Sequence, residues 1–426
     1  MRQRRRQRPR PAHRPTARSL VTAAAAWQRY YSIVFALGAV AAQLLAHTRP
    51  ARGRPDSVQL LPDNGGAGRK VTLELQLNTT DEGVVEVMTF EQDGAPDAMR
   101  FLRSGRSIIG AEFVSEEYRG QSAFRNFAIL QTVGFKAGRG RGGEQLRVLQ
   151  LGLGAGTVPS YLRREHGALV DVVEISPDIV EAATRHFHYN RDPSPVFGTT
   201  HTEDALAFLR RKPGSRRYDV VIHDLFTGGH HPLRLLERSV LHSIKARWLA
   251  KDGGVLVVDF FGYQHAGPAP RARNVNSVAV QATLEAVFGP PPFVRCFREL
   301  DVNLFPDKPA NLIFVAWVSG PPAAGAPPFV VPLDPSSGTT DGDGSVYQVQ
   351  RHFHEFEVTP QLRPRPGSAL KGFPEDMAIG PARAATAHVD ERFVEDYRDM
   401  LASFFPPAVD WFPERQGGTT AYAEEL

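Results

Sequence analysis

The chain has 426 residues, and its hydrophobic content of 42% is typical of globular domains. Its net charge of +4 comes from the N-terminus, because the first 55 residues hold twelve Arg and no Lys, Asp or Glu. The rest carries 38 basic and 46 acidic side chains, a net charge of −8, which argues against a nucleic-acid-binding body. The single cysteine, Cys296, excludes an intramolecular disulfide framework and a multi-cysteine zinc site.

The N-terminal region 1–55 is predicted to be an Arg-rich targeting or anchor segment. Its apolar stretch, residues 31–46, is short for a membrane span of about 20 residues. Three interpretations compete: a signal anchor, a mitochondrial presequence, and a cleaved secretory signal with a long basic start. We expect a membrane-anchored protein with a single N-terminal segment, or a mitochondrial one.

Four further regions follow. Alternating apolar and polar residues over 71–114 predict a small antiparallel β module. Strand and helix patterns alternate over 115–318, where the strands are continuous apolar runs, which predicts a doubly wound α/β sheet. Region 319–345 is rich in Pro, Gly, Ala and Ser and is expected to be a linker or loop. The extension 346–426 suggests no function.

The central motif is a buried strand at 148–151, followed by Gly152, Gly154 and Gly156 and then by the start of a helix. Such a glycine turn allows a ligand to approach the backbone closely, although ordinary tight turns share the pattern. A second apolar strand ends at Glu174, about 20 residues further on, the spacing of an acid that holds a ribose diol. The alternative role for Glu174 is a charge at the N-terminus of the next helix.

Two more acids lie at strand ends. Asp204 precedes a short helical pattern, and Asp224 ends the apolar run 218–224. A buried strand is expected over 255–261, with a closing antiparallel pair at 292–297 and 311–318. Because ligands of doubly wound sheets bind beyond the carboxyl ends of the strands, these acids are candidate site residues.

The segments 148–159, 172–187, 203–209, 218–224 and 252–260 together resemble the spermidine/spermine synthase family, most closely its methyltransferase-like relatives. The resemblance implies a class I S-adenosylmethionine-dependent methyltransferase (Rossmann-like) fold with a β module in front. It also implies S-adenosylmethionine, or its decarboxylated form, as cofactor.

Carried over by position, the three glycines would face the methionine part of that cofactor. Glu174 would hold the ribose hydroxyls, Asp204 would contact the adenine amine, and Asp224 would lie beneath the transferring group. Two features depart from the aminopropyl synthases. Thr227 stands where they have a second acid, and Phe124 is the nearest aromatic to their catalytic tyrosine.

Three functions remain open from the sequence. The first is methyl transfer to an amine of a protein, with Asp224 orienting or deprotonating the acceptor and His223, His230 or His231 as general base. The second is aminopropyl transfer to a polyamine, and the third is a non-catalytic nucleoside-binding scaffold. A homodimer is compatible with each, and no metal site is expected.

Overall fold

The structure is a computed structural model. It describes residues 58–59, 69–78, 84–92, 98–104, 107–116, 121–124, 126–131, 145–190, 196–214, 217–226, 231–264, 277–299, 309–319, 357–363 and 378–380. The predicted N-terminal segment with its apolar stretch 31–46 lies outside these residues, as does most of the linker and of the C-terminal extension. No helix among the described residues has the length and apolar content needed to cross a membrane.

The first described sheet is antiparallel and has five strands in chain order. They are β1 (Val58–Gln59), β2 (Arg69–Asn78), β3 (Val84–Gln92), β4 (Met99–Ser104) and β5 (Ser107–Phe113). Val85, Val87 and Leu102 of this sheet are fully buried in one hydrophobic cluster with residues of the second sheet and its helices. The β module therefore shares a core with the α/β fold.

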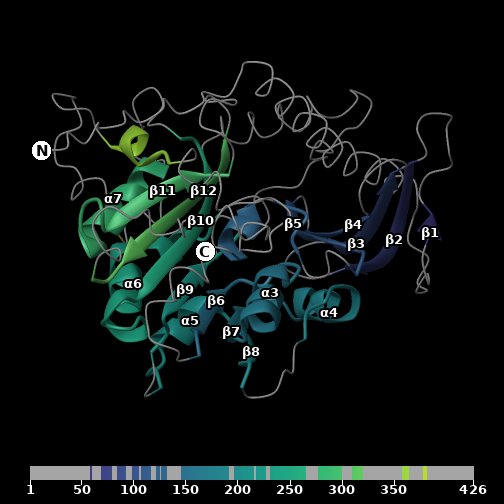
Figure 1. The fold of residues 1–426 in the computed structure, drawn as a ribbon, viewed down its shortest axis with the longest axis horizontal. Coiled ribbons are helices and arrows are strands. Elements are labelled where there is room, and N and C mark those ends of the chain that lie inside the picture. Colours follow the sequence, from purple (N-terminus) through teal and green to yellow (C-terminus); the bar gives the residue numbers. More distant parts are fainter. Residues whose placement is uncertain are drawn as a thin grey trace, which may run out of the picture. The chain divides into compact units, whose positions relative to one another are not determined.

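The second sheet has seven strands in the order β11-β12-β10-β9-β6-β7-β8 (Figure 1). They are β6 (Arg147–Leu151), β7 (Leu169–Glu174), β8 (Thr200–Thr202), β9 (Val220–His223), β10 (Val255–Gly262), β11 (Val294–Arg298) and β12 (Ala310–Trp317). Strands β10, β9, β6, β7 and β8 are parallel, whereas β12 and β11 close the sheet in antiparallel fashion. This topology is the predicted Rossmann-like, class I methyltransferase fold, so the predicted fold class is confirmed.

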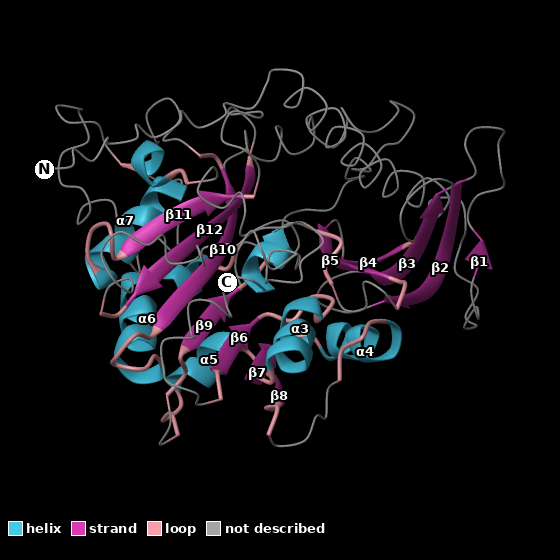
Figure 2. Cartoon of the chain, viewed as in Figure 1, coloured by secondary structure: helices cyan, strands magenta, loops and turns pink. Residues whose placement is uncertain are grey.

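Helices cover both faces of this sheet (Figure 2). The apolar residues of α3 (Thr157–His166) and α4 (Pro177–His186) belong to the cluster on one face. Those of α5 (Ala205–Arg210), α6 (Arg238–Ser243) and α7 (Ser277–Phe288) belong to the cluster on the other. Side chains alternate between the faces along each strand, so the position of a residue in its strand decides which helices it meets.

The sequence pattern predicts a helix over 237–249, and the structure has helical residues over nearly all of it. The helix begins as α6 (Arg238–Ser243) and continues without a break into the π-helical turn η2 (Ile244–Trp248). The 3₁₀ turn η1 (Leu233–Leu236) precedes it. A hydrogen bond from the Leu249 N–H to the Ile244 carbonyl closes the wider π turn.

Candidate active site

Three acidic side chains lie at the carboxyl end of the parallel sheet. Glu174 is the last residue of β7, Asp224 directly follows β9, and Asp259 lies in β10. Strand β6 pairs with both β7 and β9, so the chain reverses its direction of winding at this strand. Such a switch point is where doubly wound sheets bind ligands.

Glu174 connects the glycine turn to the start of α4. Its carboxylate accepts one hydrogen bond from the Leu153 N–H and another from the Ser176 N–H, each at 2.9 Å. The side chain is only 6% exposed. Each carboxylate oxygen can accept more than one hydrogen bond, which is the chemistry that binding of ribose hydroxyls requires. The helix is capped instead by Ser176, whose side chain accepts from the Ile179 N–H at 3.4 Å.

The glycine turn is packed tightly by the protein itself. Gly152, Gly154 and Gly156 all have positive φ angles. A Cβ atom would lie 1.9 Å from the Asp224 carbonyl oxygen at Gly152, and 2.2 Å from that of Ile109 at Gly154. The chain's own backbone therefore explains two of the glycines, and their predicted contact with the methionine part of a cofactor stays a prediction.

Asp224 is half-buried beside this turn. Its backbone N–H donates to the Leu151 carbonyl at 3.0 Å, which holds it next to β6. Burial raises the pKa of the Asp224 carboxyl to about 7, and the nearby negative charge of Glu174 contributes to the increase. A carboxyl with such a pKa can both accept and release a proton near neutral pH.

Asp259 is a site residue that was not predicted from the sequence. It is 5% exposed, and its Oδ2 accepts a hydrogen bond from the Asn126 side chain at 3.0 Å. Burial raises the pKa of Asp259 well above its usual range, and the charge of Asp224 raises it further. The available signal was an acid inside the otherwise apolar run 255–261.

Asn126 comes from a helical segment over 126–131 and was also missed. Phe124, two residues earlier, is the nearest aromatic to the catalytic tyrosine position of the aminopropyl synthases. In the structure the Phe124 ring packs edge-on against Phe101 of β4 and against Phe127. Asn126 is thus the residue of this segment that contacts an acid at the strand ends.

Two of the predicted histidines, His223 and His231, lie among the described residues, and other parts of the chain enclose both. His223 is 1% exposed within β9, and burial lowers its pKa to about 4. His231 lies between two strand ends: its Nε2 accepts from the Phe261 N–H at 2.9 Å, and its Nδ1 lies 3.2 Å from the Leu225 carbonyl oxygen. Its ring also stacks on Phe260 at 4.3 Å. These contacts hold the His231 ring against Leu225 and β10, whereas His230 and Thr227 lie outside the described residues.

Asp204 is exposed and caps α5, where its carboxylate accepts from the Ala207 N–H at 2.7 Å. This cap explains the position of the residue without a ligand. The sequence-based role at an adenine amine stays a prediction. The structure thus brings Glu174 and Asp224 together, adds Asp259, and keeps His223 inside the sheet.

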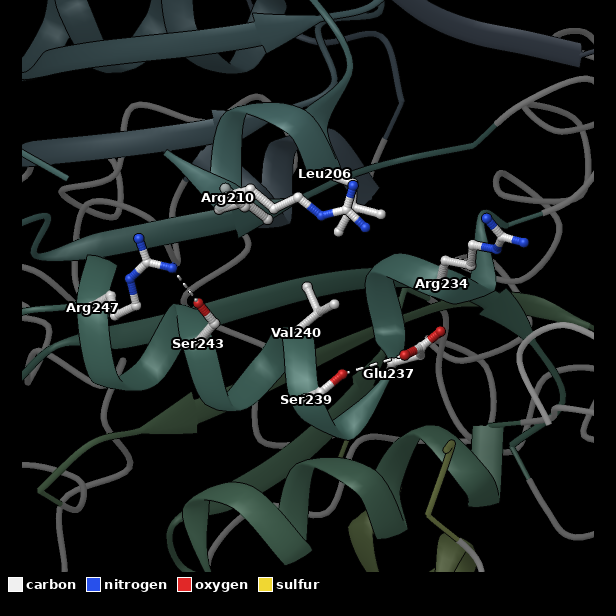
Figure 3. Close-up of a pocket in the computed structure, with 9 residues that line it drawn as sticks. Leu206, Arg210, Arg234, Glu237, Ser239, Val240, Ser243 and Arg247 are labelled. Atoms are coloured by element: carbon white, nitrogen blue, oxygen red, sulfur yellow. Dashed lines mark hydrogen bonds between the residues drawn. The ribbon is translucent and has the colours of Figure 1, made fainter. Parts of the chain in front are cut away.

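A separate hollow of about 440 Å³ lies between α5 and the segment that carries η1 and α6 (Figure 3). Arg210, Arg234 and Arg247 contribute its basic side chains, and Glu237 contributes the acid. Its lining includes none of the predicted site residues. The candidate active site is therefore defined by the strand ends, not by this hollow.

The fold and the acids at its strand ends define the class: a class I, S-adenosylmethionine-type transferase fold with a β module in front. No family model matches the chain. It is 28% identical over 243 residues to an N-terminal histidine N-methyltransferase of Emericella nidulans, covering 54% of this chain and 40% of that protein. It is 32% identical over 133 residues to a polyamine aminopropyltransferase of Vibrio vulnificus, covering 30% of this chain and 42% of that protein.

These similarities confirm the resemblance to the spermidine synthase-like family and its methyltransferase relatives. The chain spans about two fifths of the length of the curated relatives it matches. Among solved structures, it is similar to a probable spermidine synthase from Corynebacterium glutamicum, with a TM-score of 0.44, 19% identity and coverage of 57% of this chain and 78% of that one. Human methyltransferase-like protein 13 gives a TM-score of 0.34 at 17% identity, over 58% of this chain and 95% of that one. The fold assignment rests on the strand order of the chain itself.

Proposed function

We propose that this protein is an S-adenosylmethionine-dependent methyltransferase that acts on an amine nitrogen, with a protein as acceptor. The observation that carries the proposal is the buried Glu174 carboxylate, which ties the glycine turn to α4 at the switch point of a class I fold. The similarity to a histidine N-methyltransferase over 243 residues favours methyl transfer.

In this proposal Glu174 accepts hydrogen bonds from the ribose hydroxyls of the donor. The methyl group of a sulfonium is already activated, so the site mainly has to align donor and acceptor and exclude water. Asp224 lies close enough to Glu174 for their charges to interact. We propose that its carboxylate contacts the acceptor nitrogen. Its raised pKa suits the transfer of a proton from an amine near neutral pH.

Aminopropyl transfer to a polyamine is the second candidate. The similarity to a polyamine aminopropyltransferase over 133 residues favours it. The two reactions use donors that differ by one carboxylate, so affinity for the donor distinguishes them.

The decisive experiment is calorimetric titration of the protein with S-adenosylmethionine and with its decarboxylated form. Tighter binding of the carboxylated donor supports methyl transfer. Tighter binding of the decarboxylated donor supports aminopropyl transfer instead, and binding of neither contradicts both proposals.

The variant Glu174→Gln tests the ribose contact. We expect it to weaken donor binding by about 1–3 kcal/mol, because a buried polar contact to the ligand is lost. Glu165→Gln is the matched control, because Glu165 is 45% exposed on α3 and pairs with Arg164 at the surface. Unchanged affinity in a folded Glu174→Gln protein would remove the ribose assignment.

The localisation is a separate proposal. We propose that segment 1–55 directs the protein to a membrane or to mitochondria, because it is Arg-rich and acid-free and contains the apolar stretch 31–46. Fractionation of cells that express the full chain, with a mass measurement of its mature N-terminus, tests this. Recovery of the intact chain in the soluble cytosolic fraction would contradict it.

A further inference from the structure

Asp224 and Asp259 occupy neighbouring positions on adjacent parallel strands. His223 of β9 is in register with Val258 of β10, so the next residue of each chain segment is an aspartate. The residues two positions earlier, Ile222 and Val257, belong to the same hydrophobic cluster. By the two-residue period of a strand, both aspartates face the side of the sheet that carries α3 and the segment 126–131.

This side of the sheet also contains buried polar atoms without partners. Oδ1 of Asp259 has no hydrogen-bond partner in the part of the chain that the structure describes. The same holds for both side-chain amide atoms of Gln150, which is 1% exposed in β6. Gln150 is in register with Ile222 and so faces the same side. Buried polar groups are normally hydrogen-bonded, so these atoms at the carboxyl end of the sheet are candidate contacts for a ligand.

We propose that Asp224 and Asp259 together bind the protonated nitrogen of the acceptor, and that Asp259 supplies from β10 the second acid that the sequence lacks at Thr227. This inference rests on the proposed function and names the chemistry of its acceptor site: a cationic amine rather than a neutral alcohol or an anion. Asp259 is then a catalytic residue that contacts the substrate.

The charges of the pair support this assignment. Two adjacent carboxyls, one buried and one half-buried, do not both ionise readily, so the pair holds a proton near neutral pH and carries less than its full negative charge. A bound ammonium group compensates the second charge and allows both acids to ionise. The donor hydrogen bond from Asn126 keeps Asp259 in place for this contact.

The reaction then balances in two steps. An acceptor R–NH₃⁺ transfers one proton to a carboxylate of the pair and becomes R–NH₂. The nitrogen lone pair of R–NH₂ forms the new N–C bond as the S–CH₃ bond breaks, and the bonding electrons of that bond stay on sulfur. The sulfonium becomes a neutral thioether, and the product leaves as R–NH₂⁺–CH₃.

The test compares Asp259→Asn with Asp252→Asn, a matched control in the exposed turn before β10. Asparagine keeps the shape of aspartate and can still accept the hydrogen bond from Asn126. The probe for the donor site is S-adenosylhomocysteine. The acceptor site is tested with two separate probes: putrescine, and a synthetic peptide whose first residue is histidine. Calorimetry gives binding, and transfer from S-adenosylmethionine gives kcat/KM as a function of pH.

We expect Asp259→Asn to bind S-adenosylhomocysteine within twofold of the unmodified protein and to lose about 100-fold in kcat/KM. Its remaining activity should rise at higher pH, as the acceptor amine deprotonates in solution. A kcat/KM within threefold of the unmodified protein, or an unchanged pH profile, would overturn the inference.

Donor binding separates this result from a failure of the proposed function. A protein that binds S-adenosylhomocysteine but neither acceptor probe overturns the acceptor-site inference and leaves the donor proposal standing. A protein that does not bind S-adenosylhomocysteine contradicts the proposed function itself. If thermal melting shows that Asp259→Asn is unfolded, Asp259→Ser takes its place in the same comparison.

Discussion

At the scale of single residues, the candidate site combines acids whose charged forms are disfavoured in the folded protein. Asp224 and Asp259 both have raised pKa values because they are buried and lie close to other carboxylates. Groups of this kind reduce the free energy of unfolding and are retained where chemistry requires them. Removal of such a charge should therefore stabilise the protein while it abolishes function.

Asp224→Asn tests this trade-off. The folded-state pKa of Asp224 is about 7, above the value of about 4 for an unfolded chain. Its destabilising contribution is therefore absent below pH 4, grows between pH 4 and 7, and is complete above pH 7. We expect the variant to be more stable than the unmodified protein by about 2–4 kcal/mol at pH 8 and equally stable near pH 4. Denaturant unfolding at the two pH values measures this.

Asp252→Asn again serves as the control, because Asp252 lies in the exposed turn before β10, at the opposite end of that strand from the candidate site. If Asp224→Asn were less stable than the unmodified protein at pH 8, the Asp224 carboxylate would have a stabilising partner, and its proposed contact with the acceptor would be in doubt.

At the scale of elements, the glycine turn is held by three neighbours. The Gly152 N–H donates to the Val173 carbonyl at 2.8 Å, and Glu174 accepts from the Leu153 N–H. Strand β5 packs from the other side, where a Cβ atom at Gly110 would lie 2.5 Å from that of Ala155. The β module therefore limits the space available to the turn and sets its conformation.

Gly154→Ala measures how tightly β5 and the turn fit. Gly154 has a φ of 53°, and its new Cβ would lie 2.2 Å from the Ile109 carbonyl oxygen. Gly167→Ala is a matched control, because Gly167 has a φ of 60° and open space around its Cβ position. We expect Gly167→Ala to cost about 1–2 kcal/mol from backbone conformation alone, and Gly154→Ala to cost about 2 kcal/mol more from overlap.

Chemical denaturation of the two variants provides this comparison. Equal losses in unfolding free energy would mean that β5 moves away from the turn at little cost. The turn conformation would then be set by the α/β sheet alone.

At the scale of the whole molecule, an ionic network joins the β module to α4. Glu74 of β2 accepts hydrogen bonds from Thr89 and from Arg100 at 3.2 Å, and it contacts His186 at 3.2 Å. Arg100 also donates to the His186 carbonyl at 2.7 Å. Buried Glu112 accepts from the backbone N–H of His188. This network holds the β module against the fold that carries the site.

The network predicts sensitivity to acid. Burial raises the pKa of Glu74, but the hydrogen bonds from His186, Thr89 and Arg100 outweigh it and lower the pKa to about 2. A depressed pKa stabilises the fold above the unfolded value of about 4.5, and this contribution is lost as the pH falls towards 2. We expect Glu74→Gln to cost about 2 kcal/mol at pH 7 and almost nothing near pH 2, measured by denaturant unfolding.

Glu181→Gln is the control for this variant. Glu181 lies on α4, the helix that ends at His186, and forms an exposed i,i+4 pair with Arg185. A pH-independent loss in Glu74→Gln would show that its contribution comes from packing and not from its charge.

The sequence determined the fold class and part of the site. Continuous apolar runs predicted the parallel strands, and the closing pair, observed as β11 and β12, was also predicted. The spacing between the glycine turn and Glu174 predicted that both lie at the carboxyl end of the sheet. The structure shows them there, with the Leu153 N–H donating a hydrogen bond to the Glu174 carboxylate. These features are local, because they depend on periodicity and on short distances along the chain.

Only the tertiary structure decided which acids meet. Asp259 lies 35 positions after Asp224 in the sequence but beside it in the sheet, because β9 and β10 are adjacent and in register. His223 is buried because helices cover both faces of the sheet, an arrangement that a motif does not encode. Register and burial are set by packing between distant segments, so the charge environment of this site follows from the fold and not from any single stretch of sequence.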